Sequence, residues 1–349
     1  MRTFIQRFWP WLAALISGLL LALCYPGFEL HGFIWIWQAP LLAALWFSRA
    51  SWKRALWLGW LCGFTFFTIN MNWFHYVGEV VESSWAGIGA VIGMSLYLGL
   101  YFAAFAVFAT TVGRWVPEDL STPVKSKSRD IFGQSLTVLK IAFLNGACWC
   151  GLEWLRGILF TGFGWNGLGV ALKNHLTLVQ AADMIGVTGY GFILMFCGVI
   201  AFCTIVRLIR ELQSRQRVRP HIDFGIGMIT VSFLLLYGLG KLAETPRNTI
   251  DLKTRIIQLN IPIEDKFSTD TSVMRDIIFR YRDMTRMFVE STNYDLVLWP
   301  ETALPAIFGD PEVRRFFDEM VLKGEDFHLL TGMEDLDPNN RLTNNIVLM

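Results

Sequence analysis

The clearest chemical feature of the sequence is a carboxylate directly after an apolar run. Residues 294–299 are almost continuously apolar, which is typical of a strand buried on both faces. Glu301 follows this run, in the segment Trp-Pro-Glu-Thr-Ala-Leu-Pro at residues 299–305. Because α/β sheets hold catalytic groups at the carboxyl ends of their strands, Glu301 is a candidate general base. We expect Trp299 to shield it from water, and a shielded carboxylate accepts protons near neutral pH. By position alone, a helix cap or a surface turn explains Glu301 equally well.

The cysteines are the other candidate nucleophiles, because thiolates attack acyl groups readily. All six lie in or beside apolar stretches, where a thiol packs as a small hydrophobic group, so we interpret them as packing residues. They are Cys24, Cys62, Cys148, Cys150, Cys197 and Cys203. No two of the five histidines stand at metal-ligand spacing. The sequence therefore predicts no metal site and no cofactor.

The composition indicates a membrane protein. Hydrophobic residues make up 54% of the 349 residues and charged residues 17%, whereas soluble domains have roughly 25% charged residues. This excludes an ordinary soluble enzyme and a disordered chain. The net charge is +1, without the excess of basic residues that is typical of nucleic-acid binders, so no nucleic-acid partner is expected.

Seven stretches are long and apolar enough to be interpreted as membrane spans, since about 20 apolar residues cross a bilayer core. The second is short, and the fifth carries Lys140 near one end, from where a long side chain reaches the headgroups. The seven stretches are residues 8–25, 32–47, 55–77, 85–112, 136–152, 184–206 and 224–240.

The positive charges predict the orientation of these spans, because Lys and Arg stay on the cytoplasmic side. One set of alternate loops contains only Arg156 and Lys173. The other set contains fourteen basic residues: Arg2, Arg7, Arg49, Lys53, Arg54, Arg114, Lys125, Lys127, Arg129, Arg207, Arg210, Arg215, Arg217 and Arg219. The amino terminus is therefore predicted inside the cell and everything beyond residue 241 outside.

The composition becomes charged and polar from residue 249 onward, which predicts a membrane domain over residues 1–243 and a second domain over 250–349. In the second domain we expect strands at 254–260, 294–299, 327–332 and 345–348 and helices at 271–290 and 311–322. This alternation is typical of an α/β layered domain. The last strand ends the chain without a covering helix, so we expect only the first part of such a domain.

Motifs in both parts resemble one family. Residues 153–157 (Glu-Trp-Leu-Arg-Gly), then Thr161, Gly162, Phe163 and Trp165, then Gln180, Asp183, Gly186, Gly189, Tyr190 and Gly191, resemble the membrane half of the bacterial apolipoprotein N-acyltransferases. Residues that resemble the first half of that family's carbon-nitrogen hydrolase (nitrilase-like) domain are Gln258, Asn260, Ile261, Pro262, Lys266, Phe267, residues 299–305, Gly332, Asn344 and Asn345.

The resemblance implies an enzyme of the bacterial inner membrane with a periplasmic catalytic domain, an α-β-β-α sandwich of which this chain holds the first half. Such an enzyme moves an acyl chain from a phospholipid to the α-amino group of the diacylglyceryl-modified amino-terminal cysteine of an apolipoprotein, through a cysteine thioester. In the family a Glu acts as general base, a Lys stabilises the oxyanion and a Cys is the nucleophile.

Only the Glu has a counterpart here, Glu301. Phe267 stands where the family commonly has Trp, and the resemblance implies lipid contact or loop packing for it. The family's Lys and Cys, and its eighth span, have no counterpart in these residues, so we expect the chain as given to lack acyltransferase activity.

Two other functions fit the sequence. One is a different membrane-tethered nitrilase-like amidase, which would turn over a small amide in place of a lipid. The other is a non-catalytic membrane scaffold descended from the enzyme. A transporter is disfavoured, because the spans lack an internal repeat and paired midplane charges.

Overall fold

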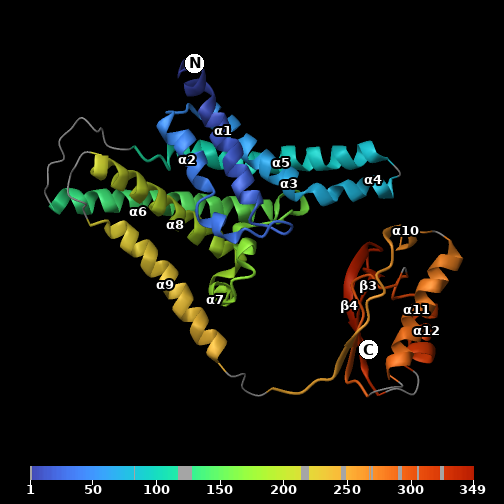
Figure 1. Ribbon diagram of the computed structural model, residues 1–349. Helices are drawn as coiled ribbons and strands as arrows, with labels where there is room; N and C mark the ends of the chain where they lie inside the picture. The colour runs from blue at the N-terminus through green and yellow to red at the C-terminus, as the bar shows by residue number, and fades with distance from the viewer. Residues whose placement is uncertain are drawn as a thin grey trace. The chain divides into compact units, whose positions relative to one another are not determined.

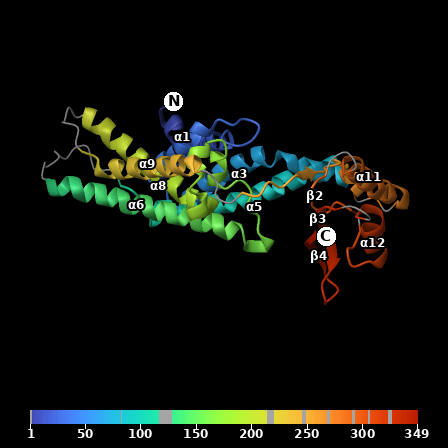
Figure 2. The ribbon, with the colours of Figure 1, turned by 90° about the horizontal axis from the view of Figure 1, so that it is seen from below.

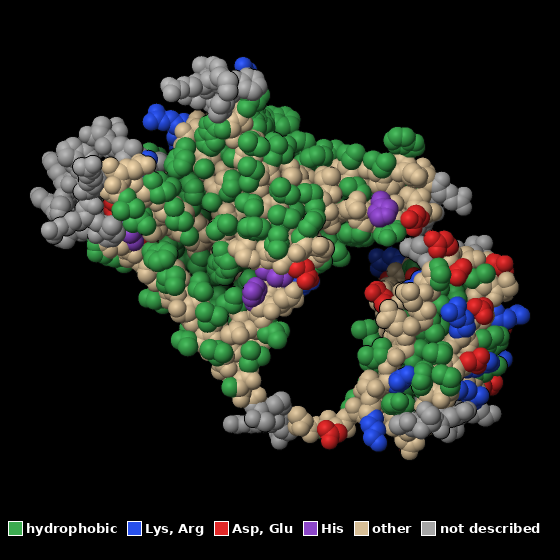
Figure 3. Space-filling model, viewed as in Figure 1, with side chains coloured by type: hydrophobic (Ala, Val, Ile, Leu, Met, Phe, Trp, Pro, Cys, Tyr) green, Lys and Arg blue, Asp and Glu red, His purple; other side chains and the backbone are tan. Residues whose placement is uncertain are grey.

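The computed structural model describes residues 2–81, 83–116, 128–213, 220–244, 249–266, 268, 270–289, 293–304, 306–322 and 326–349. The chain forms two compact units, Met1–Glu244 and Thr245–Met349, here called the membrane unit and the polar unit. Apolar side chains cover the visible face of the membrane unit, whereas acidic and basic side chains gather on the polar unit (Figure 3).

A helix forms within each of the seven apolar stretches (Figure 1). They are α1 (Arg2–Ala22), α2 (Gln38–Phe47), α3 (Trp52–Asn70), α5 (Ser84–Thr111), α6 (Ser128–Arg156), α8 (Ala182–Gln213) and α9 (Ile222–Ala243). Within the described residues, four of these helices, α5, α6, α8 and α9, are long and apolar enough to cross a membrane. Short helices α4 (Val77–Val80) and α7 (Leu176–Val179) lie between them. The chain is therefore a multi-pass membrane protein.

The second stretch differs from the continuous helix predicted over residues 32–47. A 3₁₀ turn, η1 (His31–Trp35), is followed by a break at Ile36 and Trp37 before α2 begins. With ten residues, α2 is about 15 Å long, half of the roughly 30 Å that a span needs. The buried hydroxyl of Ser17 in α1 donates a hydrogen bond to the carbonyl of Trp37. The Gln38 amide donates to the carbonyl of Trp35 at 3.1 Å. The Gln38 amide thus satisfies a carbonyl at the break, and Ser17 adds a hydrogen bond between α1 and the start of α2.

Small residues let the membrane helices approach closely. A Cβ at Gly59 in α3 would lie 2.4 Å from the carbonyl oxygen of Phe102 in α5, so only glycine fits there. Helices α3 and α5 lie side by side in both ribbon views, as do α6 and α8 (Figure 2). The close approach of α3 to α5 brings their aromatic side chains into one core with those of α6, including Phe67, Phe102 and Trp149.

The polar unit contains a four-stranded mixed sheet in the order β1-β2-β3-β4. β1 (Thr254–Ile256), β2 (Leu296–Leu298) and β3 (His328–Leu336) are parallel, and β4 (Leu342–Leu348) runs antiparallel to β3. The helices are α10 (Ile263–Lys266), α11 (Thr271–Val289) and α12 (Pro311–Phe316), which continues as a π turn over Phe317–Val321. The expected strands and helices are all present, but β1 and β2 are shorter than predicted and β3 is longer.

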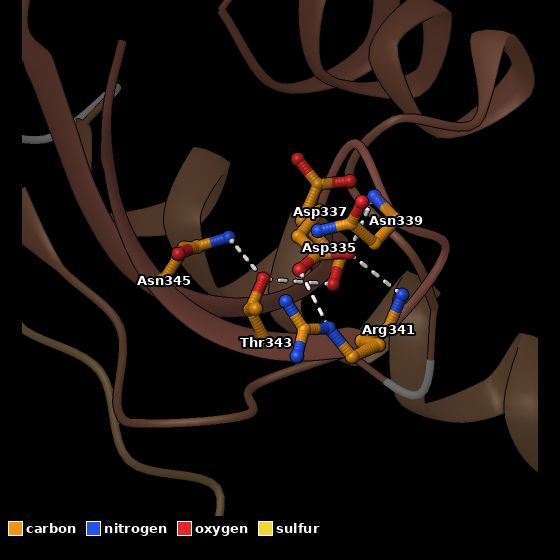
Figure 4. Close-up of polar contacts among 6 residues, drawn as sticks. All are labelled: Asp335, Asp337, Asn339, Arg341, Thr343 and Asn345. Atoms are coloured by element: carbon orange, nitrogen blue, oxygen red, sulfur yellow. Dashed lines mark hydrogen bonds and ion pairs between the residues drawn. The ribbon is translucent and has the colours of Figure 1, made fainter.

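The longer β3 reflects a hairpin where the sequence predicts only a turn-rich loop. The carboxylate of Asp337 accepts hydrogen bonds at 2.8 Å from the amides of Asn339 and Arg341, and its second oxygen pairs with the Arg341 guanidinium at 3.0 Å (Figure 4). The Thr343 hydroxyl donates to the carbonyl of Asp335 at 3.0 Å. These contacts close the turn and let β3 and β4 pair from Leu330 to Leu336.

The helices pack against one face of this sheet. Val297 of β2 and Leu329 of β3 are fully buried in a core with Ile277 and Tyr281 of α11 and Phe317 of the π turn. The opposite face is open: Ile346 is 80% exposed and Leu348 is 63% exposed. Leu296 and Leu298 on that face are only partly buried, so the prediction that this strand is buried on both faces is wrong for the described structure.

Candidate active site

Glu301 lies in the segment that leaves the carboxyl end of β2 and runs beside β3. The Trp299 amide donates to the carbonyl of Leu330 at 2.9 Å, and the Ala303 amide donates to the carbonyl of Gly332 at 3.3 Å. These bonds continue the β2–β3 pairing past the end of β2. Thr302 has a φ of +50°, in the left-handed region, where the segment turns away from the strand direction. The backbone thereby holds Glu301 beside the middle of β3.

Gly332 is what allows this close approach. A Cβ at Gly332 would lie 2.7 Å from Cα of Glu301, so any other residue would push the segment away. The Cβ position of Gly332 is on the same face of β3 as Leu330 and Glu334, which is the open face of the sheet. Glu301 therefore lies over that open face.

The carboxylate of Glu301 is exposed and has one neighbouring donor in the described residues. The side-chain amide of Asn344 in β4 donates a hydrogen bond to Oε1. Asn344 lies on the open face with Ile346, so the amide reaches Glu301 across β3. The arrangement leaves the second carboxylate oxygen free to accept a proton from a group that approaches over the sheet.

Trp299 does not shield Glu301 as the sequence analysis expects. Its ring packs in the core on the other face of the sheet, 4.9 Å from the ring of Tyr281 and 5.7 Å from that of Phe317. Its indole N–H donates to the hydroxyl of Thr285 at 3.0 Å. Alternation along the strand direction places Val297 and Trp299 on the core face, while the turn after Pro300 takes Glu301 to the open face. Trp299 anchors the segment, and Glu301 carries the accessible functional group.

The structure supports fewer conclusions about the other predicted site residues. Phe267 lies outside the described residues, so its expected substrate contact stays a prediction. The six cysteines all lie in the membrane unit, buried or partly buried and free of disulfides. The structure does not bring any of them together with Glu301 within one unit.

A second polar cluster lies in the membrane unit, around the Glu-Trp-Leu-Arg-Gly motif. Glu153, in the last turns of α6, accepts a hydrogen bond at 2.8 Å from the amide of Leu168 in the loop that follows. A Cβ at Gly191 in α8 would lie 2.3 Å from the other carboxylate oxygen. Glu153 thus ties α6, this loop and α8 together. Sequence reasoning missed this role, although the spacing of Glu153 and Arg156 within an apolar stretch was a signal for it.

Arg156, one helical turn after Glu153, is 4% exposed. Its guanidinium lies 5.3 Å from the centre of the Phe67 ring, a cation–π contact. From the charge distribution, Arg156 is expected in a loop on the outer side of the membrane. The structure places it inside the packed helices.

The loop after Arg156 has an unusual backbone. Phe160, Thr161 and Gly162 all have φ in the left-handed region, at +52°, +73° and +86°. A Cβ at Gly162 would lie 2.0 Å from the carbonyl oxygen of Gly157, which only glycine permits. The tight loop returns Phe163 to the helix end, where its amide donates to the carbonyl of Arg156 at 2.8 Å.

The membrane unit matches a known family. The model of the apolipoprotein N-acyltransferase N-terminal domain matches residues 17–200, more than half of the chain, and includes Glu153, Arg156 and Gly191. The chain belongs to the apolipoprotein N-acyltransferase family. This confirms the resemblance to the family, and the motifs of the membrane unit lie within the match.

Individual members of the family align over most of the chain. It is 29% identical to an apolipoprotein N-acyltransferase of Geobacter metallireducens over 303 residues, which are 86% of this chain and 52% of the relative. It is 24% identical to that of Rickettsia bellii, over 95% of this chain and 62% of the relative. It is 26% identical to the Rhodopseudomonas palustris protein, over 96% of this chain and 60% of the relative. The chain therefore spans about half to three fifths of the length of these curated relatives.

Proposed function

We propose that the chain is part of an apolipoprotein N-acyltransferase in which Glu301 is the general base. The observation that carries the proposal is the position of its carboxylate, exposed over the open face at the end of β2 and held by Asn344, in a chain of this family. The donor would be a membrane phospholipid, and the acceptor the α-amino group of a diacylglyceryl-modified apolipoprotein. The activity is proposed for the complete protein.

In the proposed reaction, Glu301 accepts the proton of a cysteine thiol while the sulfur attacks an ester carbonyl of the phospholipid. The lysophospholipid leaves as an alcohol and takes up that proton. The amine of the apolipoprotein then displaces the sulfur, forming the amide and restoring the thiol. The family's lysine would stabilise the oxyanion of each tetrahedral intermediate. Of these three groups, we assign only the carboxylate to a residue of this chain: residues 245–349 contain no cysteine, and none of their lysines is assigned to the oxyanion role.

The proposed topology has the amino terminus in the cytoplasm and the polar unit in the periplasm of a bacterial inner membrane. It counts seven crossings: the four long apolar helices together with α1, α3 and the broken segment of η1 and α2. The distribution of fourteen basic residues in one set of loops against two in the other supports this count. With one crossing fewer, every later loop would change sides, and both sides of the membrane would carry many basic residues.

The test is Glu301→Gln in the complete protein that contains residues 1–349. We expect the variant to be produced in normal amount and to form no thioester with a phospholipid that carries a labelled acyl chain. Glu312→Gln is the matched control, since Glu312 is an exposed carboxylate on α12. Thioester formation by Glu301→Gln at the unaltered rate would refute the general-base role.

The same assay separates the two other functions. An amidase of the same superfamily would release ammonia from a small amide and leave the labelled lipid intact. A scaffold would turn over neither substrate in the complete protein. The reading frame beyond codon 349 adds an independent check, because the acyltransferase needs a lysine and a cysteine in the same domain as Glu301.

A further inference from the structure

Helix α9 carries the chain from the membrane unit to the polar unit, so the position of its outer end determines where the polar unit is attached. Its inner end is fixed by the ion pair of Asp223 with Arg207 of α8. Further along, Ile229 and Leu236 are each 69% exposed, so that side of α9 adds no support. The outer end is held by a separate set of contacts, which involve α7 and the first turn of α8.

The outer half of α9 lies directly on the backbone of α7. A Cβ at Gly238 would lie 1.7 Å from the carbonyl oxygen of Thr177, so only glycine permits this approach. Helix α7 is a single turn, and Tyr190 of α8 holds it by donating a hydrogen bond to the carbonyl of Leu178. The support for α9 is therefore itself tied to α8.

Asp183, in the first turn of α8, makes the polar contact with the same end of α9. Its Oδ2 accepts a hydrogen bond at 2.8 Å from the Tyr237 hydroxyl and lies 3.8 Å from Nζ of Lys241. That Nζ also lies 3.4 Å from Oε2 of Glu244, at the end of the helix. Because Tyr237 and Lys241 are one helical turn apart, a single carboxylate joins two successive turns of α9.

The position of Asp183 depends on a break in α8. Gly186 has a φ of +64°, which glycine adopts without the steric penalty of other residues. The first turn of α8 is thereby offset from the rest of the helix, and Asp183 reaches α9 from this turn. Asp183, Gly186 and Tyr190 all belong to the motif that the sequence shares with the family, yet none of them takes part in the proposed proton transfer.

We propose that Asp183 is a positioning residue that fixes the outer end of α9 and with it the point where the polar unit is attached. The inference rests on the proposed function, because the reaction at Glu301 requires the polar unit to meet a lipid of the membrane. A loosened attachment lets Glu301 sample more positions, of which a smaller share is productive. Loss of Asp183 therefore slows thioester formation and leaves its pH dependence unchanged.

Hydrogen exchange tests the contact in purified residues 1–349 in detergent. In Asp183→Ala we expect the amides of residues 237–243 to exchange about fivefold faster, because the last turns of α9 open more often. The side chains of Asp183 and Lys241 are 48% and 34% exposed, and such pairs add little to global stability, so the variant should fold. Glu79→Gln is the matched control, an exposed carboxylate on α4. Native exchange in Asp183→Ala would overturn the proposal.

Tyr237→Phe is the second variant, and it removes only the hydroxyl that donates to Asp183. It should accelerate the same amides to a smaller extent, because Lys241 still faces the carboxylate. If Asp183→Ala does not fold, native exchange in Tyr237→Phe would overturn the proposal in its place.

Thioester formation in the complete protein tests the consequence for the reaction. At saturating phospholipid, Asp183→Ala should react about three- to tenfold more slowly, with an unchanged KM and pH profile. Asp183→Glu retains the charge and the acceptor and should recover most of the rate, and Glu79→Gln should react normally.

Three results would contradict the positioning role: an unaltered rate in Asp183→Ala, a loss confined to KM, or a shifted pH profile. The last two would mean that Asp183 acts on the substrate or on a proton. Failure of the unaltered complete protein to form any thioester is a different result, because it refutes the proposed function and the positioning role with it.

Discussion

The side-chain amide of Asn344 donates a hydrogen bond to Oε1 of Glu301, linking β4 to the segment that follows β2. The contact fixes one carboxylate oxygen and leaves the other exposed. A residue from the β3–β4 hairpin thus positions the proposed base, although it lies more than forty positions further along the chain.

Removing this contact should slow the proposed reaction without unfolding the protein. In the complete protein, Asn344→Ala should lower the rate of thioester formation by about 10- to 100-fold, because a misplaced catalytic group costs rate steeply. Asn345→Ala is the control, since Asn345 points to the other side of β4 and bonds Thr343 at 3.1 Å. Equal rates for the two variants would show that Asn344 does not position Glu301.

The Trp299 side chain should stabilise the fold of the polar unit. Trp299→Ala should destabilise the polar unit by about 3–5 kcal/mol, the usual cost of deleting a buried aromatic side chain. Trp299→Phe retains a ring but leaves the buried Thr285 hydroxyl without its donor, at a cost of about 1–3 kcal/mol. Hydrogen exchange of peptides from α11 and β2 measures both effects. Native protection in Trp299→Ala would refute the anchoring role.

Gly191 should be intolerant of a side chain. In Gly191→Ala the new Cβ would lie 2.3 Å from Oε2 of Glu153 and force that carboxylate away, with a cost of about 1–3 kcal/mol for overpacking. Gly151→Ala in α6 meets nothing within 4 Å and should be neutral or slightly stabilising, because alanine favours helix. Thermal unfolding in detergent compares the two. Equal melting temperatures would argue against the proposed tie.

The β3–β4 turn should weaken in acid. The Arg341 amide, which donates to the carboxylate, lowers the pKa of Asp337 below its ordinary value. A depressed folded-state pKa contributes stability that is fully present above the unfolded value of about 3.9 and is lost as the pH falls through the folded value. Asp337→Asn should therefore expose the hairpin amides to faster exchange at pH 7. That difference from the unaltered protein should shrink in acid, and a constant difference would contradict the sign.

The orientation can be tested with a membrane-impermeant thiol reagent. Asp265→Cys in α10 should be labelled from outside intact spheroplasts, whereas Lys53→Cys at the start of α3 should be labelled only after the membrane is opened. The unaltered protein measures the background from its six buried or partly buried cysteines. Protection of position 265 in intact spheroplasts would reverse the proposed topology.

The sequence predicts the positions of most elements because hydrophobic periodicity is a local signal. The seven apolar stretches, the helix from Thr271 and the strand before Trp299 all follow from residue patterns within a few turns of chain. The position of Glu301 at the end of a strand follows from the same reasoning. The contacts of the Trp299 side chain could not be predicted from neighbouring residues in the sequence, because they depend on which face of the sheet α11 covers.

Long-range contacts account for the other differences. Glu153 of α6 accepts a hydrogen bond from the Leu168 amide and lies close to Gly191 of α8, so it joins three segments. The burial of Arg156 against Phe67 of α3 depends on how α3, α5 and α6 pack. By its position in the sequence, Arg156 is a basic residue at the end of an apolar run, which favours a charge exposed at the membrane surface.

The break before α2 has a consequence for how the protein enters the bilayer. Ten helical residues, which include the polar Gln38, do not reach across the hydrocarbon. The Gln38 amide bonds the carbonyl of Trp35 within the segment, and the buried Ser17 hydroxyl of α1 bonds the carbonyl of Trp37. Polar side chains are unfavourable in lipid unless they are paired and enclosed. We therefore expect the first two segments to integrate as a pair rather than one at a time.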